Sequence, residues 1–549
     1  MKNFLLLPLG FTHVIDIYML GLISVISTIL TIFAGYKLLQ VLQLTGYKIN
    51  GFVRWFKETK YSYFSRLFML SFLSVAAMLM TNVLLKDFFV IRILNYVSIL
   101  FYFLFATIFV SNLYTARQKT PLVFTKRMTR FLVVYAILIL IFTVLFSYIG
   151  FMFIPYLSYG FVGIIPIILP GIVFIAYYLT YPFEKLISIH YLRKAKKKLA
   201  KLNLKVIGIT GSYGKTSVKN ILGTILEEKF KVCVTPASFN TPLGLSKTIL
   251  KNLKSDDEVF IAEMGAKQRY DIKELCGIVQ PDIGVITGVG NQHLLTFGNI
   301  DNIIETKGEL AEFVSKNNGD VFISTESDNA KKLAEKYDNA VKINLKSKDS
   351  LIVVSKIKVT KDGSEFDLSD ANKTIHCKTV LLGKHNISNI LLSANVAYKM
   401  GLSLELIANA IAKLKPVPHR LELVKSDEFY TILDDAYNSS VEGSKAAIEV
   451  LSHFKCRKIV VTPGMVELGE EQYDANFEFG HNLSKVADIV IIDYAQNFEA
   501  ISSGLIQAGF DEKNIIQTAT LSQSVKLLME MAGKDDLVLF ENDLPDNYS

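Results

Sequence analysis

The stretch from Phe131 to Phe146 contains no charged side chain and consists mostly of large apolar residues. A helix needs about 20 such residues to cross the roughly 30 Å hydrocarbon core of a membrane. The chain contains four further apolar stretches of similar length, and we interpret all five as membrane-spanning helices. Buried helices of a soluble core are the alternative, but they seldom lack charge over such a length. The five predicted spans lie at about 15–35, 67–85, 93–112, 131–150 and 159–180.

Basic residues are concentrated on one side of these spans. Residues 36–66 contain six Lys or Arg, residues 113–130 contain five and residues 181–205 contain eight, whereas the loops between are nearly uncharged. Because Lys and Arg near span ends stay on the cytoplasmic side, five spans predict an external N-terminus and a cytoplasmic chain after residue 180. The run Arg193–Lys198 is expected to bind anionic headgroups, unless it serves only as a topology signal.

The formal net charge of +8 is unevenly distributed over the 549 residues. Residues 1–205 contain 22 Lys and Arg against 4 Asp and Glu, a net charge of +18, and residues 206–549 contain 37 against 47, a net charge of −10. The positive charge therefore belongs to the apolar third, and nucleic-acid binding is not expected. The four cysteines form no C-x-x-C pair, so no zinc ribbon or disulfide framework is predicted.

A glycine-rich motif marks the start of the more polar part of the chain. Residues 205–217 read Lys-Val-Ile-Gly-Ile-Thr-Gly-Ser-Tyr-Gly-Lys-Thr-Ser, and a helical pattern follows. A strand that enters a glycine-rich turn and then a helix places backbone N–H groups against phosphate oxygens. Lys215 would reach the β- and γ-phosphates, and the Thr216 hydroxyl would hold Mg²⁺. Ile209 replaces the first glycine of the full G-x-x-x-x-G-K-[ST] motif, but the context favours nucleotide binding.

Strands and helices alternate over the remaining residues, which predicts mainly parallel sheets in two α/β domains. In the first domain we expect strands at 205–210, 257–262, 283–288 and 320–324, with helices at 215–229, 303–316, 386–401 and 404–414. Residues 340–382 are expected to form an antiparallel flap. The second domain is Rossmann-like, with strands at 429–433, 458–462, 488–492 and 536–540. The predicted organisation is a helical membrane domain (1–185), a basic linker (186–204) and α/β domains at 205–418 and 419–549.

The segment Thr210–Thr216 resembles the ATP loop of the Mur ligases, which form the amide bonds of the peptidoglycan stem peptide. Seven further motifs follow in the order found in that family: Ser238–Gly244, Glu263–Gly265, Val289–His293, Thr306–Glu309, Gly383–Asn389, His419–Leu421 and Asp434–Asn438. The last motif, together with Gly464–Gly469, is most similar to the MurF branch, which adds D-alanyl-D-alanine to a tripeptide precursor. The resemblance covers about 206–549 and implies a central P-loop domain and a C-terminal ligase domain, with ATP between them.

The resemblance also implies roles for single residues. ATP binding is implied for Gly211, Ser212, Tyr213, Gly214, Lys215, Thr216, Ser217, Asn386, Asn389, Arg420, Asp435 and Asn438. Metal binding is implied for Thr216, Glu263, His293 and Lys307, the lysine being carbamylated and therefore anionic. Asn240 and Thr241 are implied in substrate binding. Catalytic roles are implied for Lys215, Lys307, His293 and Arg420.

Each of these residues has a simpler explanation when it is considered alone. Glu263 and Arg420 could be surface charges, Lys307 a solvated lysine on a helix face, and His293 a histidine that binds no metal. Helix or turn capping is the ordinary role of the polar residues Asn386, Asn389, Asp435 and Asn438. The order of these residues behind a phosphate-binding loop favours the functional interpretation.

Two departures from the MurF pattern concern the acceptor. Enzymes of that branch usually carry a soluble N-terminal domain that holds the UDP-sugar, and here apolar stretches take its place. The ending Leu539–Tyr548 also differs from the Lys-Gly-Ser ending of the branch. A lipid-linked or otherwise altered acceptor therefore stays open beside the usual one.

We expect a ligase in the cytoplasmic membrane, with its catalytic domains in the cytoplasm, that uses ATP and Mg²⁺ to activate a carboxylate as an acyl phosphate. A UDP-MurNAc-peptide would be the acceptor and a D-Ala-D-Ala-like amine the second substrate, with membrane lipids and other cell-wall synthesis proteins as further partners. The second hypothesis keeps this chemistry with a lipid-linked acceptor. A third, an ATP-driven transporter or scaffold, predicts a Leu-Ser-Gly-Gly signature, which the sequence lacks.

Overall fold

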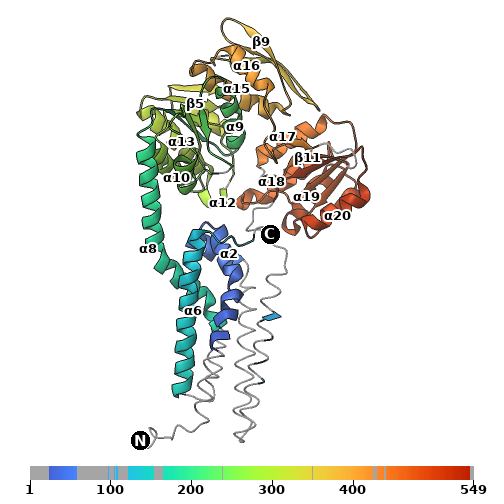
Figure 1. The fold of residues 1–549 in the computed structure, drawn as a ribbon. Coiled ribbons are helices and arrows are strands. Elements are labelled where there is room, and N and C mark those ends of the chain that lie inside the picture. Colours follow the sequence, from blue (N-terminus) through green and yellow to red (C-terminus); the bar gives the residue numbers. More distant parts are fainter. Residues whose placement is uncertain are drawn as a thin grey trace, which may run out of the picture. The chain divides into compact units, whose positions relative to one another are not determined.

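The computed structural model describes residues 24–26, 28–58, 97, 100, 104, 107–108, 121–153, 165–237, 239–292, 294–348, 350–424, 430–437 and 440–543. They fall into two compact units, one up to Ile187 and one from Ser188 onward. The described part of the first unit is mainly helical, and the described part of the second unit contains three β-sheets (Figure 1).

The helices of the first unit are α2 (Tyr36–Leu44), α3 (Ile49–Glu58), α6 (Lys126–Phe153) and the first part of α8 (Ile165–Leu199). Three helical segments are long and apolar enough to cross a membrane, namely Ser24–Leu44, Lys126–Ile149 and Ile167–Leu199. They correspond to the first, fourth and fifth predicted spans. The predicted span at 67–85, and most of that at 93–112, lie outside the described residues.

Helix α8 does not end with the apolar stretch at residue 180. It passes Pro170 and Pro182 and continues to Leu199, so most of the segment that we expected to be a linker, 186–204, is helical. Three lysines occupy its last turn, where positive charge offsets the partial negative charge of the helix end. Within the second unit, Ala195 and Leu199 pack into a hydrophobic core.

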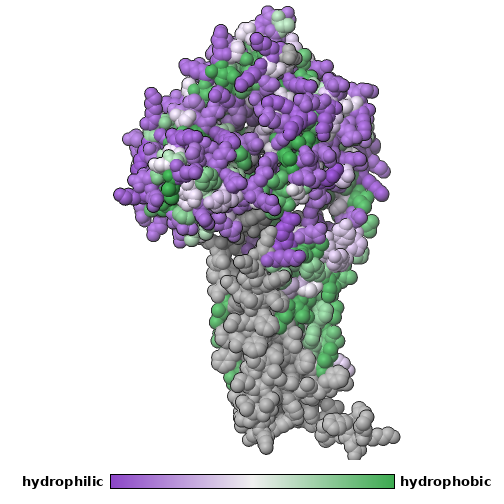
Figure 2. Space-filling model, turned by 180° about the vertical axis from the view of Figure 1, so that it is seen from behind, coloured by the Kyte–Doolittle hydropathy of each residue, from purple (hydrophilic) through white to green (hydrophobic). Residues whose placement is uncertain are grey.

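Apolar side chains cover much of the surface of the described helices of the first unit. Val133, Ile137 and Val144 of α6 are each about half exposed. In Figure 2 hydrophobic residues line the described helices, whereas the surface of the second unit in that view is mainly hydrophilic. Contiguous exposed apolar surface of this kind is typical of a membrane or protein interface.

An ion pair joins two of these helices. Arg130 of α6 donates two hydrogen bonds to the Glu184 carboxylate of α8, at 2.6 and 2.9 Å.

The first sheet of the second unit is parallel throughout, in the order β2-β3-β1-β4-β5-β6. Its strands are β2 (Val232–Val234), β3 (Val259–Glu263), β1 (Lys205–Thr210), β4 (Ile283–Ile286), β5 (Asp320–Ser324) and β6 (Ala340–Ile343). The accompanying helices are α9 (Lys215–Leu226), α10 (Pro242–Lys251), α11 (Asp271–Val279), α12 (Leu294–Phe297), α13 (Ile300–Lys316) and α14 (Asp328–Ala334). Strands β1 and β5 have the predicted bounds, and α9 covers all but the last three residues of the predicted 215–229 helix.

The predicted antiparallel flap at 340–382 begins too early. Residues 340–343 form β6, which pairs in parallel with β5 because Ala340 and Ile343 are buried at the edge of the first sheet. The antiparallel sheet comprises β7 (Val353–Thr360), β8 (Gly363–Ser369) and β9 (Thr374–Thr379). Helices α15 (Lys384–Lys399) and α16 (Leu404–Ala412) follow it.

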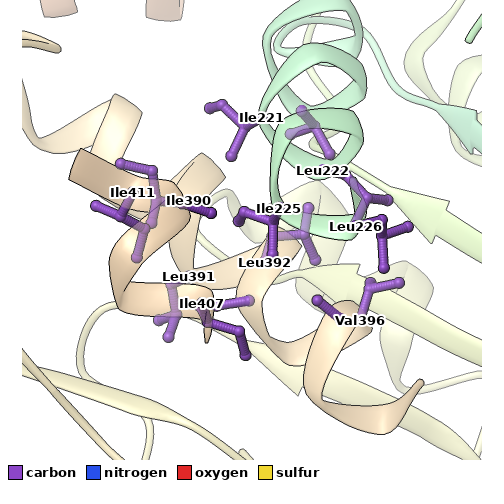
Figure 3. Close-up of a cluster of buried hydrophobic side chains, with 14 of the residues drawn as sticks. Ile221, Leu222, Ile225, Leu226, Ile390, Leu391, Leu392, Val396, Ile407 and Ile411 are labelled. Carbon is purple, nitrogen blue, oxygen red and sulfur yellow. The ribbon is translucent and has the colours of Figure 1, made fainter. Parts of the chain in front are cut away.

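Helices α9, α15 and α16 share one hydrophobic core, shown in Figure 3. Its labelled side chains are Ile221, Leu222, Ile225 and Leu226 of α9, Ile390, Leu391, Leu392 and Val396 of α15, and Ile407 and Ile411 of α16. Close packing of this kind transmits strain and holds helices in one register. The glycine-rich loop that precedes α9 is thereby fixed relative to the start of α15.

The last sheet has the order β10-β11-β15-β12-β13-β14, with β10 antiparallel and the other strands parallel. Its strands are β10 (Glu422–Val424), β11 (Thr431–Asp435), β12 (Lys458–Thr462), β13 (Ile489–Ile492), β14 (Ile515–Gln517) and β15 (Leu537–Glu541). Its helices are α17 (Val441–Ser452), α18 (Gln472–Leu483), α19 (Ala495–Gln507) and α20 (Leu521–Met531), with the short 3₁₀ turns Gly469–Glu471 and Glu512–Asn514. The four predicted strands are present, displaced by at most two residues. The three-residue strands β10 and β14 were not predicted.

Candidate active site

The glycine-rich loop lies at the carboxyl end of β1, a central strand of the first sheet, between the ends of β3 and β4. Gly211 has a φ of +156°, and a Cβ atom there would lie 2.1 Å from Thr287 Oγ1. Gly214 has a φ of +76° and precedes α9 without a side-chain cap. The loop therefore requires glycine at both positions, and the first N–H groups of α9 are placed to meet an anion.

Lys215 begins α9 and turns its ammonium group back over the loop. Its Nζ donates to the carbonyl oxygens of Gly211 and Ser212, at 2.7 and 3.1 Å. Burial lowers the pKa of Lys215 to about 8, Glu263 opposes the shift and the Arg420 guanidinium adds to it. A lysine held in this way at the mouth of a glycine-rich loop can pair with a phosphate group.

Glu263, the last residue of β3, is almost fully buried; its carboxylate receives hydrogen bonds from two side chains and forms an ion pair with a third. Asn240 Nδ2 donates to Oε1 at 3.0 Å, and Thr216 Oγ1 donates to Oε2 at 3.1 Å. Lys219 Nζ lies 3.0 Å from the same Oε2 atom. The sequence interpretation identified Glu263, Thr216 and Asn240 but missed Lys219. The signal for it was its position four residues after Lys215, one turn along the same helix.

Thr241 serves a local structural role. Its hydroxyl accepts a hydrogen bond from the Gly244 N–H at 3.3 Å and so caps the N-terminus of α10. Asn240, just before it, also accepts the Gly265 N–H through its backbone oxygen at 3.0 Å. The pair therefore ties the segment that we expected to bind substrate to the end of β3.

Lys307 lies on α13 with only 3% of its surface exposed. Burial lowers its pKa to about 7, and the nearby charge of Lys215 lowers it further, whereas Asp271 and Glu309 act in the opposite direction. The alternative that Lys307 is a solvated lysine is therefore wrong. At neutral pH the Lys307 amine is therefore unprotonated and nucleophilic in a large fraction of the molecules.

The remaining loop residues pack closely. The Ser212 hydroxyl donates to the Gly290 carbonyl at 3.0 Å, and the Tyr213 ring lies where a Cβ atom on Gly288 would be. Burial raises the pKa of Tyr213 to about 12, and a hydrogen bond with Ser327 opposes this shift. Ser217 is half-buried in the first turn of α9.

The two asparagines of α15 differ in what they contact. Asn389 lies against the glycine-rich loop, because its Oδ1 atom would be 3.1 Å from a Cβ atom on Gly214. Asn386 is buried, and its Nδ2 atom donates to the Leu382 carbonyl at 2.8 Å. Asn389 is thus beside the loop, while the side chain of Asn386 holds the start of α15.

Arg420 follows the segment that connects the two α/β domains, between His419 and Leu421, which both have positive φ. Its guanidinium group lies 4.4 Å from the centroid of the Tyr437 ring. Burial lowers the pKa of Arg420, and the charges of Asp435 and, more weakly, Glu263 oppose the shift. Arg420 is therefore within electrostatic reach of the carboxylate at the glycine-rich loop.

Asp435 ends β11 and is buried. Its Oδ1 atom accepts the Leu421 N–H at 3.1 Å. Burial raises its pKa to about 6, against the opposing effects of Arg420 and a hydrogen bond with Glu541.

Two predicted site residues, His293 and Asn438, lie outside the described residues.

The arrangement fits a divalent cation in part. Glu263 and Thr216 offer oxygen ligands of the kind that Mg²⁺ prefers. Within the described residues no three His, Cys, Asp or Glu side chains form a cluster that could hold a metal. Water and phosphate oxygens would be among the further ligands of a magnesium ion at Glu263, as is common for Mg²⁺.

Two protein-family models match this chain. The model of the Mur ligase middle domain matches residues 209–397, and that of the Mur ligase glutamate ligase domain matches residues 419–541. Both matches lie in the second unit, and the first includes the glycine-rich loop.

The individual proteins that are similar to this chain are also Mur ligases. The UDP-N-acetylmuramoyl-tripeptide--D-alanyl-D-alanine ligase of Bacillus subtilis (strain 168) is 28% identical over 349 residues, which are 63% of this chain and 75% of that protein. The ligase of the same name from Escherichia coli (strain K12) is 26% identical, over 59% and 72% of the two chains. The structure of a MurF ligase from Thermotoga maritima in complex with ADP matches with a TM-score of 0.58 and 29% identity, over 65% of this chain and 80% of that one.

Proposed function

The chain belongs to the Mur ligase family, and on this premise we propose that it is a MurF-type ligase that uses ATP to join D-alanyl-D-alanine, or a similar amine, to a UDP-MurNAc tripeptide. The observation that carries the proposal is the position of Lys215 at the glycine-rich loop, where its ammonium group donates to the Gly211 and Ser212 carbonyl oxygens. The Arg420 guanidinium group is near enough to lower the pKa of Lys215. Two cations placed in this way suit a reaction between two anions, a carboxylate and a triphosphate.

The reaction has two steps. A carboxylate oxygen of the acceptor attacks the terminal phosphorus of ATP, so that an acyl phosphate forms and ADP leaves. The nitrogen of the incoming amine then attacks the carbonyl carbon, the C–O bond to phosphate breaks, and the nitrogen loses a proton. Phosphoryl transfer depends mainly on positioning and electrostatic stabilisation, so the protein must supply positive charge at the transferring group.

The residues divide this work between them. The N–H groups of the loop and the Lys215 ammonium group bind the phosphates, and Arg420 adds charge from the connecting segment. Glu263 and Thr216 would hold Mg²⁺, which neutralises charge on the transferring phosphoryl group. The low pKa of Lys307 leaves an amine that can add CO₂, and the resulting carbamate would place an anionic oxygen ligand near the metal.

We propose further that the first unit attaches the enzyme to the cytoplasmic membrane with the catalytic domains in the cytoplasm. Support comes from the three long apolar helices, their exposed apolar side chains and the distribution of basic residues. A lipid-linked acceptor is the second candidate, because a membrane location would bring the catalytic domains close to such a molecule.

Product analysis in detergent tests both candidates. We expect the release of ADP and phosphate to require both a UDP-MurNAc tripeptide and D-alanyl-D-alanine, with a product mass equal to the sum of the two minus water. Equal turnover without any amine would contradict the ligase proposal. Turnover with a lipid-linked acceptor, and none with the UDP-linked one, would favour the second candidate.

A further inference from the structure

Lys219 is a buried lysine to which the mechanism above gives no role. Only 2% of its side chain is exposed, and the same holds for its partner Glu263. Removing a charged pair from water in this way is costly unless the geometry is good and further hydrogen bonds satisfy both groups. Thr216 and Lys219 are three residues apart on α9, so both side chains reach the same carboxylate oxygen from one face of the helix.

Lys219 also binds a second segment. Its Nζ atom donates to the Ala237 carbonyl at 2.6 Å, and Ala237 has a φ of +43°, in the region that side chains disfavour. Residues on both sides of Ala237 also contact Glu263. Thr235 Oγ1 accepts the Glu263 N–H at 3.1 Å, and Asn240 Nδ2 donates to Glu263 Oε1. Lys219 thus connects α9, the end of β3 and the residues around Asn240.

We propose that Lys219 is a positioning residue that serves as the resident counter-cation of Glu263, keeping the carboxylate from binding a divalent cation until the cation arrives with nucleotide phosphates. This inference rests on the proposed function only in taking Glu263 as the metal-binding carboxylate. The ammonium group already lies against Oε2, the oxygen that Thr216 also contacts. A divalent ion at Oε2 would meet the charge of Lys219 at close range and that of Lys215 nearby.

Phosphate groups would change this balance. The negative charges of a bound triphosphate offset the lysines, so that a cation can share Glu263 with Lys219 at little electrostatic cost. Without nucleotide the same cation is repelled. The device would therefore couple metal binding to nucleotide binding while holding the Asn240 segment in place in both states.

Titration of the nucleotide-free protein with Mn²⁺, followed by electron paramagnetic resonance, tests the proposal without any turnover. We expect weak binding by the wild type and binding on the order of tenfold tighter, or more, by Lys219→Met, because one positive charge next to the ion is gone. Lys219→Arg keeps the charge and should bind as weakly as the wild type. Tight binding by the wild-type protein, or equal affinity in Lys219→Met, would overturn the proposal.

Two controls make the result specific. Lys231 forms a comparable but exposed ion pair with Asp256 at 2.9 Å, so Lys231→Met should leave Mn²⁺ affinity unchanged. In the double variant Lys219→Met with Glu263→Gln the gain should disappear, and a gain that persists would place the ion elsewhere and contradict the proposal. If Lys219→Met does not fold, tight Mn²⁺ binding by the nucleotide-free wild type would still overturn the proposal. The Mn²⁺ result is independent of whether D-alanyl-D-alanine is joined to anything, so the two proposals fail separately.

Discussion

Lys215→Ala is expected to lower the rate of ADP formation by roughly a hundredfold to a thousandfold, since loss of one preorganised donor to a developing charge has an effect of this size. Within the part of the chain that the structure describes, the Lys215 ammonium group donates to two carbonyl oxygens of the glycine-rich loop, and a phosphate can replace these partners. Steady-state measurement of ADP release at saturating substrates checks the expectation.

A second lysine near α9 provides the control. Lys229 is exposed and donates to the Gly401 carbonyl at 2.7 Å, so Lys229→Ala should turn over at the wild-type rate. Because burial already disfavours the charged form of Lys215, Lys215→Ala should unfold at a temperature no lower than the wild type. Undiminished ADP release by a folded Lys215→Ala protein would remove the glycine-rich loop from the mechanism.

Lys307→Met is expected to make the protein more stable and inactive. The pKa of Lys307 is about 7 in the folded chain and about 10.4 in an unfolded one. At pH 7 folding must therefore release about half a proton from this site on average, which costs on the order of 4 kcal/mol that methionine does not incur. The variant should unfold at higher denaturant concentration in CO₂-free buffer, and ADP formation should fall below detection if a carbamate is required.

The pH dependence of stability tests whether the titration of Lys307 causes the stability difference between the wild type and Lys307→Met. Between pH 7 and about 10 the unfolded chain binds more protons than the folded chain at this site, so the wild type gains stability as pH rises through this window. The variant lacks this contribution, and the stability difference between the two proteins should shrink toward pH 10. A difference that is constant with pH would mean that packing and not titration is responsible. Bicarbonate should raise wild-type activity and leave the variant unchanged.

The sequence allowed close prediction wherever a signal was local. β1 and β5 have the predicted bounds because each is a short apolar run between polar residues, and the glycine-rich loop occupies the expected turn. Residues 340–343 were misassigned because a four-residue segment has the same pattern in a parallel edge strand as in a hairpin. Their partner, β5, lies beyond an intervening helix.

Contacts between distant segments could not be predicted. Lys219 and Glu263, which form an ion pair, are 44 positions apart in the sequence (263 − 219 = 44). A lysine on a helix is also usually solvated, so the sequence offered no reason to expect this pair. The continuation of α8 to Leu199 was also missed, because its charged residues indicated a linker, whereas Ala195 and Leu199 are buried in the core that they reach. In both cases burial against another part of the chain determined the outcome.

The shared core of α9, α15 and α16 restricts where motion can occur during turnover. The loop before α9 and the residue Asn389 on α15 lie next to each other and belong to a single closely packed body. We expect opening and closing to take place about the proline-containing segment 415–421. Spectroscopic labels on α9 and α15 should keep a constant separation throughout the catalytic cycle, while labels on α9 and α17 should approach and separate once per product formed.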